Sequence, residues 1–305
     1  METHDFVVIG AGPGGYSAAI YAARYKMDIL LIGEVPGGIA GTSHDIRNYP
    51  GFKQISGMEL MMKMIEQAKA LNVPIKQDIV TDIKKTDEGF LLKTRKEEIL
   101  AKKILISTGT ARRELGIPRE KELTGKGVSY CATCDAGFYQ DKVAAVIGGG
   151  DAALTAALLI SKFAKKVYII YRKGEFTKAE VSWIDEVNNT KNIEVMFNEE
   201  VEELIGKEKL EKIKLKSGKE VELDGIFIEI GGTPNTKLAQ ELGINMDNGS
   251  IIVDKNQETN VHGIFAAGDV TDRPFKQIVS AAGDGATACY EAFKQLRSEK
   301  ASDTK

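Results

Sequence analysis

Two copies of one pattern constrain the fold of this 305-residue chain more than any other feature. Each copy has an apolar run, a glycine-rich loop of the form G-x-G-x-x-G/A, an apolar segment of helical length and a second apolar run. The first copy covers residues 6–32, with GAGPGG at 10–15, and the second covers 143–171, with GGGDAA at 148–153. Both copies are typical of the βαβ unit that opens a nucleotide-binding domain. The repeat therefore predicts an α/β fold with two Rossmann-like nucleotide-binding domains.

Each glycine of such a loop has a separate physical task. The first makes the turn, the second lets the backbone approach a diphosphate, and the third lets helix and strand pack closely. The diphosphate then lies on free N–H groups at the helix N-terminus, where the helix dipole favours anions. A single loop of this kind can be a ligand-free turn, but two in full context favour nucleotide binding. The predicted contact residues are Gly10, Gly12, Pro13 and Gly15 in the first copy and Gly148, Gly150, Asp151 and Ala153 in the second.

The residue at the end of each second apolar run predicts which nucleotide is bound. Glu34 lies 24 residues after Gly10, and Arg172 lies 24 residues after Gly148. An acid at this position accepts hydrogen bonds from a free ribose 2′-OH, whereas a base suits a 2′-phosphate. The first site is therefore predicted to bind FAD or NAD, and the second, with Arg172 and Lys173, to bind NADP. A solvated strand end is the alternative for Arg172 and Lys173.

Two further apolar runs that end in glycine, at residues 104–109 and 226–232, fall where each nucleotide-binding half would end. A third apolar run, at 263–269, ends in Gly-Asp, and its acid could accept a hydrogen bond from a cofactor hydroxyl. The second unit is predicted to be inserted into the first, with connections near 116–118 and 233–235. The predicted borders are 1–116 with 242–305 for the first domain and 117–241 for the second.

Composition excludes several classes of protein. The net charge is −3, from 41 basic and 44 acidic residues, which argues against a nucleic-acid partner. The N-terminus has no basic region before its apolar run, so it is not a signal peptide. The most apolar stretch, 143–160, contains three glycines and Asp151 and is a poor membrane span. These features predict a cytoplasmic protein.

A pair of cysteines just before the second copy is the candidate redox centre. Cys131 and Cys134 stand in the segment CATCD, and such a Cys-x-x-Cys pair can close to a disulfide and reopen to two thiols. A structural zinc site needs four Cys or His ligands, and Cys289, the only other cysteine, lies in a distant predicted helix. We therefore predict no metal, and we interpret Cys289 as a small buried apolar residue. Asp135 is placed to exchange a proton with a departing thiolate.

With these motifs in order, the chain resembles the low-molecular-weight thioredoxin reductases, of the class II pyridine nucleotide–disulfide oxidoreductase family. The resemblance extends from Phe6 to Leu296. It rests on segments that occur in the family's order: GAGPGG, PGG at 36–38, NYPGF at 48–52, CATCD at 131–135, GGGDAA, TPN at 233–235 and FAAGD at 265–269, then KQIVSAAGDG at 276–285.

The resemblance implies an NADPH-dependent, FAD-containing enzyme that reduces the disulfide of a thioredoxin-like protein and works as a homodimer. It makes the first predicted domain the FAD-binding one and the second the NAD(P)H-binding one. Cys131 matches the cysteine that attacks the partner disulfide, Cys134 the cysteine that faces the flavin, and Asp135 the proton donor. The positions that match flavin contacts are Gly10, Gly12, Gly15, Gly33, Glu34, Gly37, Gly38, Ile39, Asn48, Asp269, Lys276, Gln277 and Ile278.

The chain departs from the family pattern chiefly in the second nucleotide site. The family has Gln where Ile39 stands, and acidic residues where Thr155 and Ala156 stand. Its basic strand end reads His-Arg-Arg with a later Arg, whereas this chain has Tyr171-Arg172-Lys173 and Thr177. Three alternatives stay open on sequence alone. They are another electron donor (NADH or ferredoxin), a small-molecule dithiol substrate, and a nucleotide- or flavin-binding regulatory protein without turnover.

Overall fold

The computed structural model describes residues 1–302, and the chain divides into two compact units. Unit 1 is Met1–Ala111 with Pro234–Lys305, and unit 2, Arg112–Thr233, is inserted between those two segments. This confirms the predicted fold class of two Rossmann-like units with the second inserted into the first. Residues 303–305, the end of the first predicted domain, lie outside the described residues.

The borders between the units fall earlier in the chain than the sequence indicates. They lie at Ala111/Arg112 and Thr233/Pro234, rather than at 116/117 and 241/242. Leu115 packs with the apolar core of unit 2, whereas Leu238 and Ala239 pack with a core of unit 1. The chain crosses where β7 (Thr110–Arg112) pairs with β16 (Gly232–Pro234).

Unit 1 is built on a mixed sheet with the strand order β3-β2-β1-β6-β5-β4, and β19 also pairs with β6. Strands β1, β2, β3, β6 and β19 run parallel, and β4 and β5 form an antiparallel extension. Central strands such as Phe6–Ile9 are apolar throughout because both sheet faces are covered. The strands of this sheet are β1 (Glu2–Ile9), β2 (Ile29–Ile32), β3 (Ile75–Lys76), β4 (Val80–Thr86), β5 (Gly89–Thr94), β6 (Glu98–Ile106) and β19 (Ile264–Ala266). In unit 1, β17 (Met246–Asp247) and β18 (Ser250–Ile251) pair with each other in a separate sheet.

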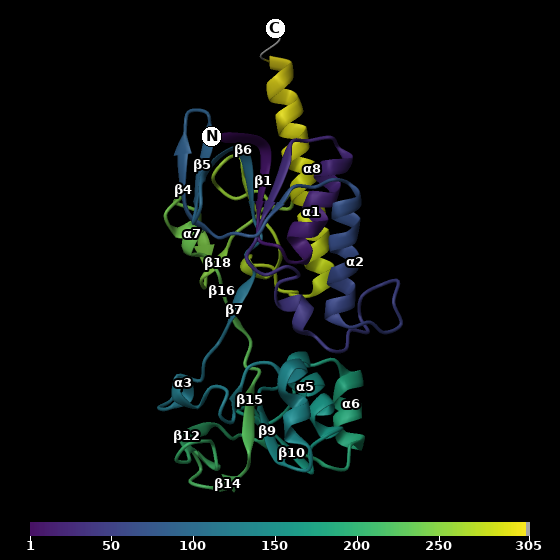
Figure 1. Cartoon of the computed structure of the whole chain (residues 1–305), viewed down its shortest axis with the longest axis vertical. Helices are drawn as coiled ribbons and strands as arrows, with labels where there is room; N and C mark the ends of the chain where they lie inside the picture. Colours follow the sequence, from purple (N-terminus) through teal and green to yellow (C-terminus); the bar gives the residue numbers. More distant parts are fainter. Residues whose placement is uncertain (303–305) are drawn as a thin grey trace. The chain divides into compact units, whose positions relative to one another are not determined.

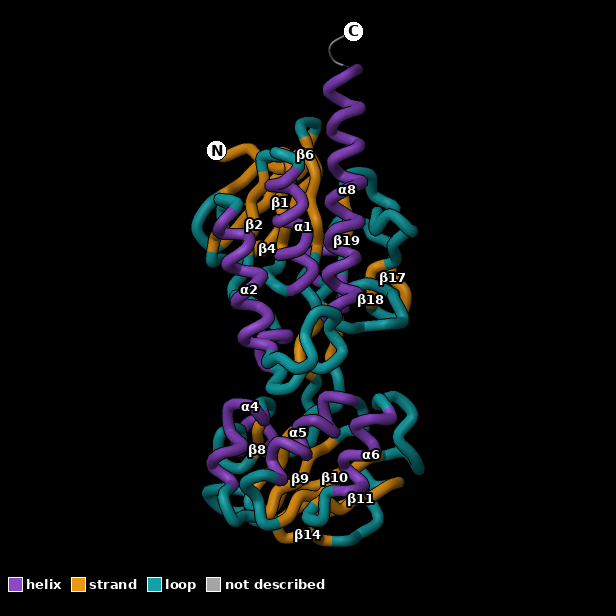
Figure 2. The backbone as a smooth tube through the Cα atoms, turned by 90° about the vertical axis from the view of Figure 1, so that its right-hand side faces the viewer, coloured by secondary structure: helices purple, strands orange, loops and turns teal. Residues whose placement is uncertain are grey.

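Helices α1, α2 and α8 of unit 1 stand together beside β1 (Figures 1 and 2). They bury Tyr16, Met61 and Leu296 with Phe6 of the sheet in one continuous core. A capping box begins α2, in which Ser56 and Glu59 satisfy each other's backbone N–H groups. The helical elements of unit 1 are α1 (Pro13–Arg24), η1 (Ile39–Thr42), α2 (Gly57–Ala70), α7 (Lys237–Gln240), η3 (Gly268–Val270) and α8 (Ile278–Ser302).

Unit 2 has a parallel sheet with the order β11-β10-β9-β15-β8. One face packs on α5 and α6, and the other on an antiparallel sheet of β12, β13 and β14. Its elements are α3 (Glu120–Leu123), β8 (Val128–Ser129), α4 (Ala132–Asp135), η2 (Ala136–Tyr139), β9 (Val143–Ile147), α5 (Asp151–Ser161), β10 (Lys166–Tyr171), α6 (Val181–Asn189), β11 (Ile193–Phe197), β12 (Val201–Ile205), β13 (Lys212–Leu215), β14 (Glu220–Glu222) and β15 (Gly225–Ile228).

Cys289 lies fully buried in α8, as the sequence predicts. Burial raises the pKa of its thiol to about 12, so the thiol stays protonated at neutral pH. Among residues 1–302, no helix combines the length and the apolar character that crossing a membrane requires.

Helices α1 and α8 pack closely because glycines remove the side chains between them. A Cβ atom at Gly285 would clash with the carbonyl oxygen of Gly14, and one at Gly14 would lie 3.1 Å from the carbonyl oxygen of Ala281. Further along the pair, the rings of Tyr25 and Phe293 stack with centroids 4.5 Å apart. The contact brings the first turn of α1 against the backbone of α8.

We predict that Gly285→Ala lowers the free energy of unfolding by about 1–3 kcal/mol, because the added methyl group overpacks the contact with backbone atoms. The matched control is Gly283→Ala, two positions earlier in α8, where a Cβ meets nothing within 4 Å. That change should be neutral or stabilise by up to about 1 kcal/mol, as Ala favours helices over Gly. Urea unfolding followed by circular dichroism measures both, and equal stability of the two variants would contradict the proposed packing.

Candidate active site

Cys131 and Cys134 form a disulfide at the start of α4. Their Cα atoms are 5.3 Å apart, within the usual range for a bridge. Cys131 is the N-cap of α4 and is half-buried, and Cys134 is exposed. The backbone N–H of Cys134 donates to Sγ of Cys131 at 3.3 Å, a bond that would also stabilise a thiolate on Cys131. The predicted redox pair is therefore bonded and accessible.

Ser129 connects Asp135 to the disulfide. Its hydroxyl donates to Oδ2 of Asp135 at 2.6 Å and accepts the backbone N–H of Cys131 at 3.1 Å. Ser129 is only 5% exposed, so this hydrogen-bond chain holds the carboxylate of Asp135 in place. The sequence analysis missed Ser129, although its position two residues before Cys131 is a local signal.

The segment before the disulfide is also held by a buried carboxylate. Glu120 accepts the backbone N–H groups of Leu115 and Gly116, each at 2.8 Å, and the hydroxyl of Tyr130 at 2.6 Å. Burial and the charge of Glu120 raise the pKa of Tyr130 above its usual value, so this phenol stays a donor. Glu120 thereby ties the residue next to Cys131 to α3.

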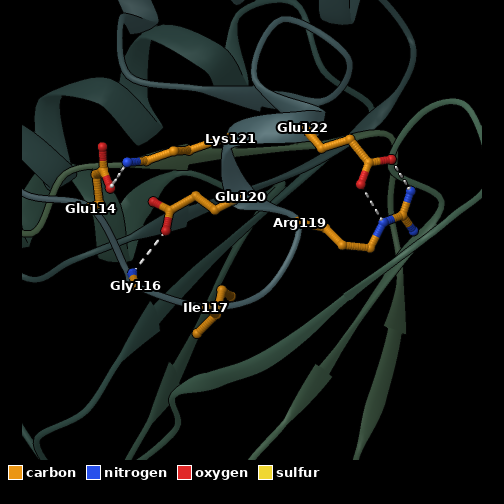
Figure 3. Close-up of a pocket in the computed structure, with 7 residues that line it drawn as sticks. All are labelled: Glu114, Gly116, Ile117, Arg119, Glu120, Lys121 and Glu122. Atoms are coloured by element: carbon orange, nitrogen blue, oxygen red, sulfur yellow. Dashed lines mark hydrogen bonds and ion pairs between the residues drawn. The ribbon is translucent and has the colours of Figure 1, made fainter.

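A surface pocket of about 430 Å³ is lined by residues of the 114–122 segment, among them Glu120. Figure 3 shows the side chains that line it. Its charged side chains are paired with each other: Lys121 with Glu114 at 3.3 Å, and Arg119 with Glu122 at 2.8 Å. The two cysteines do not line it. The pocket therefore is not where the disulfide reacts.

The first glycine loop (residues 10–15) lies where β1 ends and α1 begins. Gly10 has φ +116°, and a Cβ there would clash with the carbonyl oxygen of Ser107 on the neighbouring strand. Gly15 lies against the carbonyl oxygen of Gly10, and Pro13 takes the first position of α1. A Cβ at Gly12, in contrast, would meet nothing within 4 Å. Protein atoms therefore crowd the loop at Gly10 and Gly15, whereas the space at Gly12 is free. This free space fits a diphosphate above the start of α1.

The segment after β2 folds over this loop. Gly33 lies against Ala11, and the backbone N–H of Gly37 donates to the carbonyl oxygen of Ala11 at 2.8 Å. A Cβ at Gly38 would lie 3.4 Å from Cα of Gly12. The structure thus brings the predicted residues from Gly33 to Gly38 onto the first loop, and Ile39 follows as the exposed first residue of η1.

Glu34, the predicted ribose-binding acid, has a partner that the sequence does not reveal. Its carboxylate pairs with Arg95 at 3.1 Å, and both side chains are more than half exposed. An exposed ion pair of this kind contributes little to stability, so it leaves Glu34 able to exchange partners.

The C-terminal part of unit 1 contributes a second group of predicted residues. Nδ2 of Asn48 donates to Oε1 of Gln277 at 3.2 Å, although the two are 229 residues apart. Nζ of Lys276 donates to the carbonyl oxygen of Asp269 at 3.0 Å. Burial raises the pKa of Asp269, and Ile278 begins α8. Asn48 and the 276–278 segment therefore lie together in unit 1.

The second glycine loop (residues 148–153) repeats the geometry in unit 2. Gly148 has φ +146°, and a Cβ there would clash with the carbonyl oxygen of Glu229. A Cβ at Gly150, the N-cap of α5, would meet nothing within 4 Å. Oδ1 of Asp151 accepts the backbone N–H of Glu180 at 2.7 Å, which ties the start of α5 to the start of α6. Ala153 is fully buried against the sheet.

The two predicted bases of unit 2 follow β10 directly. Arg172 and Lys173 are both exposed, and Nζ of Lys173 donates to Oγ1 of Thr177 at 3.2 Å. A negative 2′-phosphate could therefore reach both side chains from solvent. Thr177 fills the position where the resembling family has a further arginine.

Glu229 is a residue of this region that the sequence analysis missed. It follows β15 at the same sheet edge as the second loop. Burial raises the pKa of its carboxyl to about 7, and the charge of Arg112 opposes this rise. Its only sequence signal is an acid inside an otherwise apolar run, IFIEIGG.

Within residues 1–302, no group of three or more His, Cys, Asp or Glu residues is arranged to hold a metal ion. Cys131 and Cys134 are bonded to each other, and Cys289 is buried in α8.

Comparison with known proteins agrees with this geometry. The family model described as pyridine nucleotide-disulphide oxidoreductase matches residues 4–285. The thioredoxin reductase of Bacillus subtilis is 36% identical, over 94% of this chain and 93% of that protein. A 34.2 kDa protein in the rubredoxin operon of Clostridium pasteurianum is 37% identical over 96% of this chain and 97% of its own length.

The crystal structure of Lactococcus lactis thioredoxin reductase superposes with a TM-score of 0.92 at 38% identity, covering 95% of this chain and 98% of that one. The two glycine loops, the bonded Cys-x-x-Cys pair and a family match over nearly the whole chain lead to one conclusion. This chain belongs to the pyridine nucleotide-disulphide oxidoreductase family.

Proposed function

We propose that this chain is a thioredoxin-disulfide reductase that passes electrons from NADPH through FAD and Cys131–Cys134 to the disulfide of a thioredoxin-like protein. The observation that carries the proposal is the disulfide itself. It lies at the start of α4, where Cys134 is exposed, in a chain whose two glycine loops each leave free space for a diphosphate, at Gly12 and at Gly150. Pure nucleotide binding needs no dithiol, so an enzyme is favoured over a regulatory protein.

The residues of unit 1 fit a flavin dinucleotide. The opening at Gly12 would take the diphosphate, and the segment from Gly33 to Gly38 would cover it. Glu34 would accept hydrogen bonds from the adenosine ribose, while Asn48 and Gln277 would hold the flavin end. Bound flavin supplies two-electron chemistry, since it accepts hydride from a nicotinamide nucleotide and gives two electrons to a disulfide.

The residues of unit 2 fit a nicotinamide nucleotide. The opening at Gly150 would take its diphosphate at the start of α5. Arg172 and Lys173 would pair with the 2′-phosphate of NADPH, which NADH lacks.

The reduced cysteine pair then carries out thiol–disulfide exchange. The Cys131 thiolate attacks one sulfur of the partner disulfide, breaks that bond and forms a mixed disulfide. The partner takes the two protons that the Cys131 and Cys134 thiols release on becoming thiolates, one on each released sulfur. Asp135, which Ser129 holds near Cys131, would carry the proton to the first of these sulfurs. The Cys134 thiolate next attacks Sγ of Cys131, releases the second partner thiol and restores the Cys131–Cys134 bond. The partner thereby gains two electrons and two protons.

An exposed aromatic side chain favours a protein partner over a small dithiol. Phe138, in η2 directly after α4, is 72% exposed. Burying such a ring against a partner removes much apolar surface from water and anchors the complex. A small-molecule dithiol would leave this ring uncovered.

Two further parts of the proposal rest on the family resemblance. The chain works as a homodimer and in the cytoplasm. Sedimentation equilibrium of the flavin-loaded protein measures the first, and cell fractionation the second.

The first functional prediction concerns the two cysteines. Cys131→Ser should abolish reduction of a thioredoxin-like substrate yet leave flavin bound and reducible. Cys134→Ser should accumulate a mixed disulfide with the partner, because the resolving thiol is missing. Cys289→Ala, which removes a buried thiol far from α4 in sequence, is the control and should keep activity. Turnover by Cys131→Ser at the wild-type rate would show that the assignment is wrong.

The second prediction uses the two loops as reciprocal controls. A Cβ at Gly12 or at Gly150 would meet no protein atom within 4 Å, and both positions have the extended backbone that valine favours, so both variants should fold. Gly12→Val should purify without the yellow flavin, because its side chain occupies the diphosphate position. Gly150→Val should keep the flavin but lose its reduction by NADPH. Absorbance at the flavin band measures both, and a fully flavin-loaded Gly12→Val protein would contradict the proposed site.

The third prediction concerns the donor. Charge-assisted hydrogen bonds contribute about 1.5–3 kcal/mol, so Arg172→Ala should lower kcat/KM for NADPH roughly ten- to a hundredfold. The value for NADH should barely change, since NADH has no phosphate to lose. Lys191→Ala, an exposed cation elsewhere in unit 2, is the control. Equal, slow flavin reduction by both nucleotides in the wild type would rule out NADPH and indicate another donor, such as ferredoxin.

A further inference from the structure

The carboxyl end of β15 carries a carboxylate that the proposed electron path does not use. The backbone N–H of Glu229 donates to the carbonyl oxygen of Ile147 at 2.8 Å, so pairing with β9 continues to this residue. Phe227 packs in the core beside α5, whereas Ile228 packs in the core on the opposite face. Side chains alternate along a strand, so Glu229 faces the α5 side, like Phe227.

Glu229 also lies directly against the second glycine loop. A Cβ at Gly148 would clash with the carbonyl oxygen of Glu229 and would lie 2.9 Å from Cβ of Ala153. The loop can approach the strand end this closely only because Gly148 has no side chain. A diphosphate placed on the loop would therefore lie next to the strand end that carries Glu229, whose side chain faces the same side of the sheet as α5.

Burial and one cation act on the Glu229 carboxyl in opposite directions. The charge of Arg112, on β7, lowers its pKa, and burial raises the pKa by more. Asp151, the acid of the second loop, accepts the backbone N–H of Glu180. Because burial dominates, the carboxyl titrates near pH 7, as described above, and not in the range of an exposed glutamate.

We propose that Glu229 couples binding of the nicotinamide nucleotide to the uptake of one proton from solvent. An ionised carboxylate beside the diphosphate would repel it, whereas a neutral carboxyl can donate a hydrogen bond to a phosphate or ribose oxygen. This inference rests on the proposed function of the second loop. It assigns to Glu229 the role of positioning and selecting the bound nucleotide.

The affinity for the nucleotide is expected to fall as the pH rises. Well below pH 7, Glu229 is already protonated, so binding takes up no proton and affinity is at its maximum. Above pH 7 each binding event must first protonate the carboxylate, so the dissociation constant rises up to about tenfold per pH unit. Between about pH 6 and about pH 8.5 the expected loss of affinity is roughly thirtyfold.

The test titrates the flavin-loaded protein with NADP⁺, which binds without transferring hydride. Dissociation constants are measured by calorimetry for the wild type and Glu229→Gln at about pH 6 and about pH 8.5. Glutamine mimics the neutral acid and cannot ionise. The ratio of the two constants at one pH cancels any titration of the ligand's own 2′-phosphate. Glu222→Gln, which removes an exposed carboxylate on β14, is the control.

The ratio of wild-type to Glu229→Gln dissociation constants should be near one at the lower pH and roughly thirty at the higher pH. Glu222→Gln should match the wild type at both. Equal ratios at the two pH values would overturn the inference while leaving the proposed function intact. Failure of the wild type to bind NADP⁺ at either pH would instead contradict the proposed function.

A second measurement needs no variant. Calorimetry of the wild type at about pH 7.5, in two buffers of different ionisation enthalpy, counts the protons taken up. About three quarters of a proton per nucleotide is expected there. The proton uptake measured for Glu229→Gln, which lacks the titrating carboxyl, is subtracted where that variant folds. A remaining uptake of zero would overturn the inference.

Discussion

Close backbone contact at the end of the central strand is the constraint on which both units depend. Gly10 lies against Ser107 in unit 1, and Gly148 lies against Glu229 in unit 2. Each contact requires a residue without a side chain in a positive-φ conformation, and each brings the start of a helix to the carboxyl edge of a sheet. With the loop in this position, the first N–H groups of the helix lie next to free space, at Gly12 in unit 1 and at Gly150 in unit 2.

The redox centre is held by a different means. Helix α4 has only four residues, too few to be stable by its own hydrogen bonds. Side chains from the preceding segment hold it instead: Ser129 binds Asp135, and Glu120 binds Tyr130. These polar contacts act together with the packing of Ala132 in the apolar core beside α5, and the motif CATCD contains neither Ser129 nor Glu120.

The features that could be predicted from the sequence are those that depend on the spacing of residues close together in the chain. The glycine loops, their flanking strands and helices, the Cys-x-x-Cys pair and the buried Cys289 all follow from residues close in the chain. The unit borders depend on where Leu115 and Leu238 pack, and no local pattern reports that. The pairing of Glu34 with Arg95, and of Asn48 with Gln277, joins residues 61 and 229 positions apart. In the sequence Glu229 is one acid in an apolar run. Its neighbour Gly148 follows β9 and lies 81 residues earlier in the chain, so no local pattern reports the contact.

The crossing between the units has a consequence for chain entropy. On the unit 1 side of β7 and β16, Asn235 is bonded to the Thr108–Gly109 segment. Oγ1 of Thr108 donates to the carbonyl oxygen of Asn235 at 2.8 Å, Nδ2 of Asn235 donates to the carbonyl oxygen of Thr108 at 3.0 Å, and the backbone N–H of Asn235 donates to the carbonyl oxygen of Gly109 at 2.9 Å. An insertion the length of Arg112–Thr233 would impose a loop-closure penalty if it were unstructured. The inserted unit folds on its own core, and its two ends lie on the paired strands β7 and β16. The two segments of unit 1 are therefore joined by this short strand pair and not by a long flexible loop. Because Arg112 and Thr233 lie on paired strands, an insertion that folds on its own adds little to the entropy cost of closing unit 1.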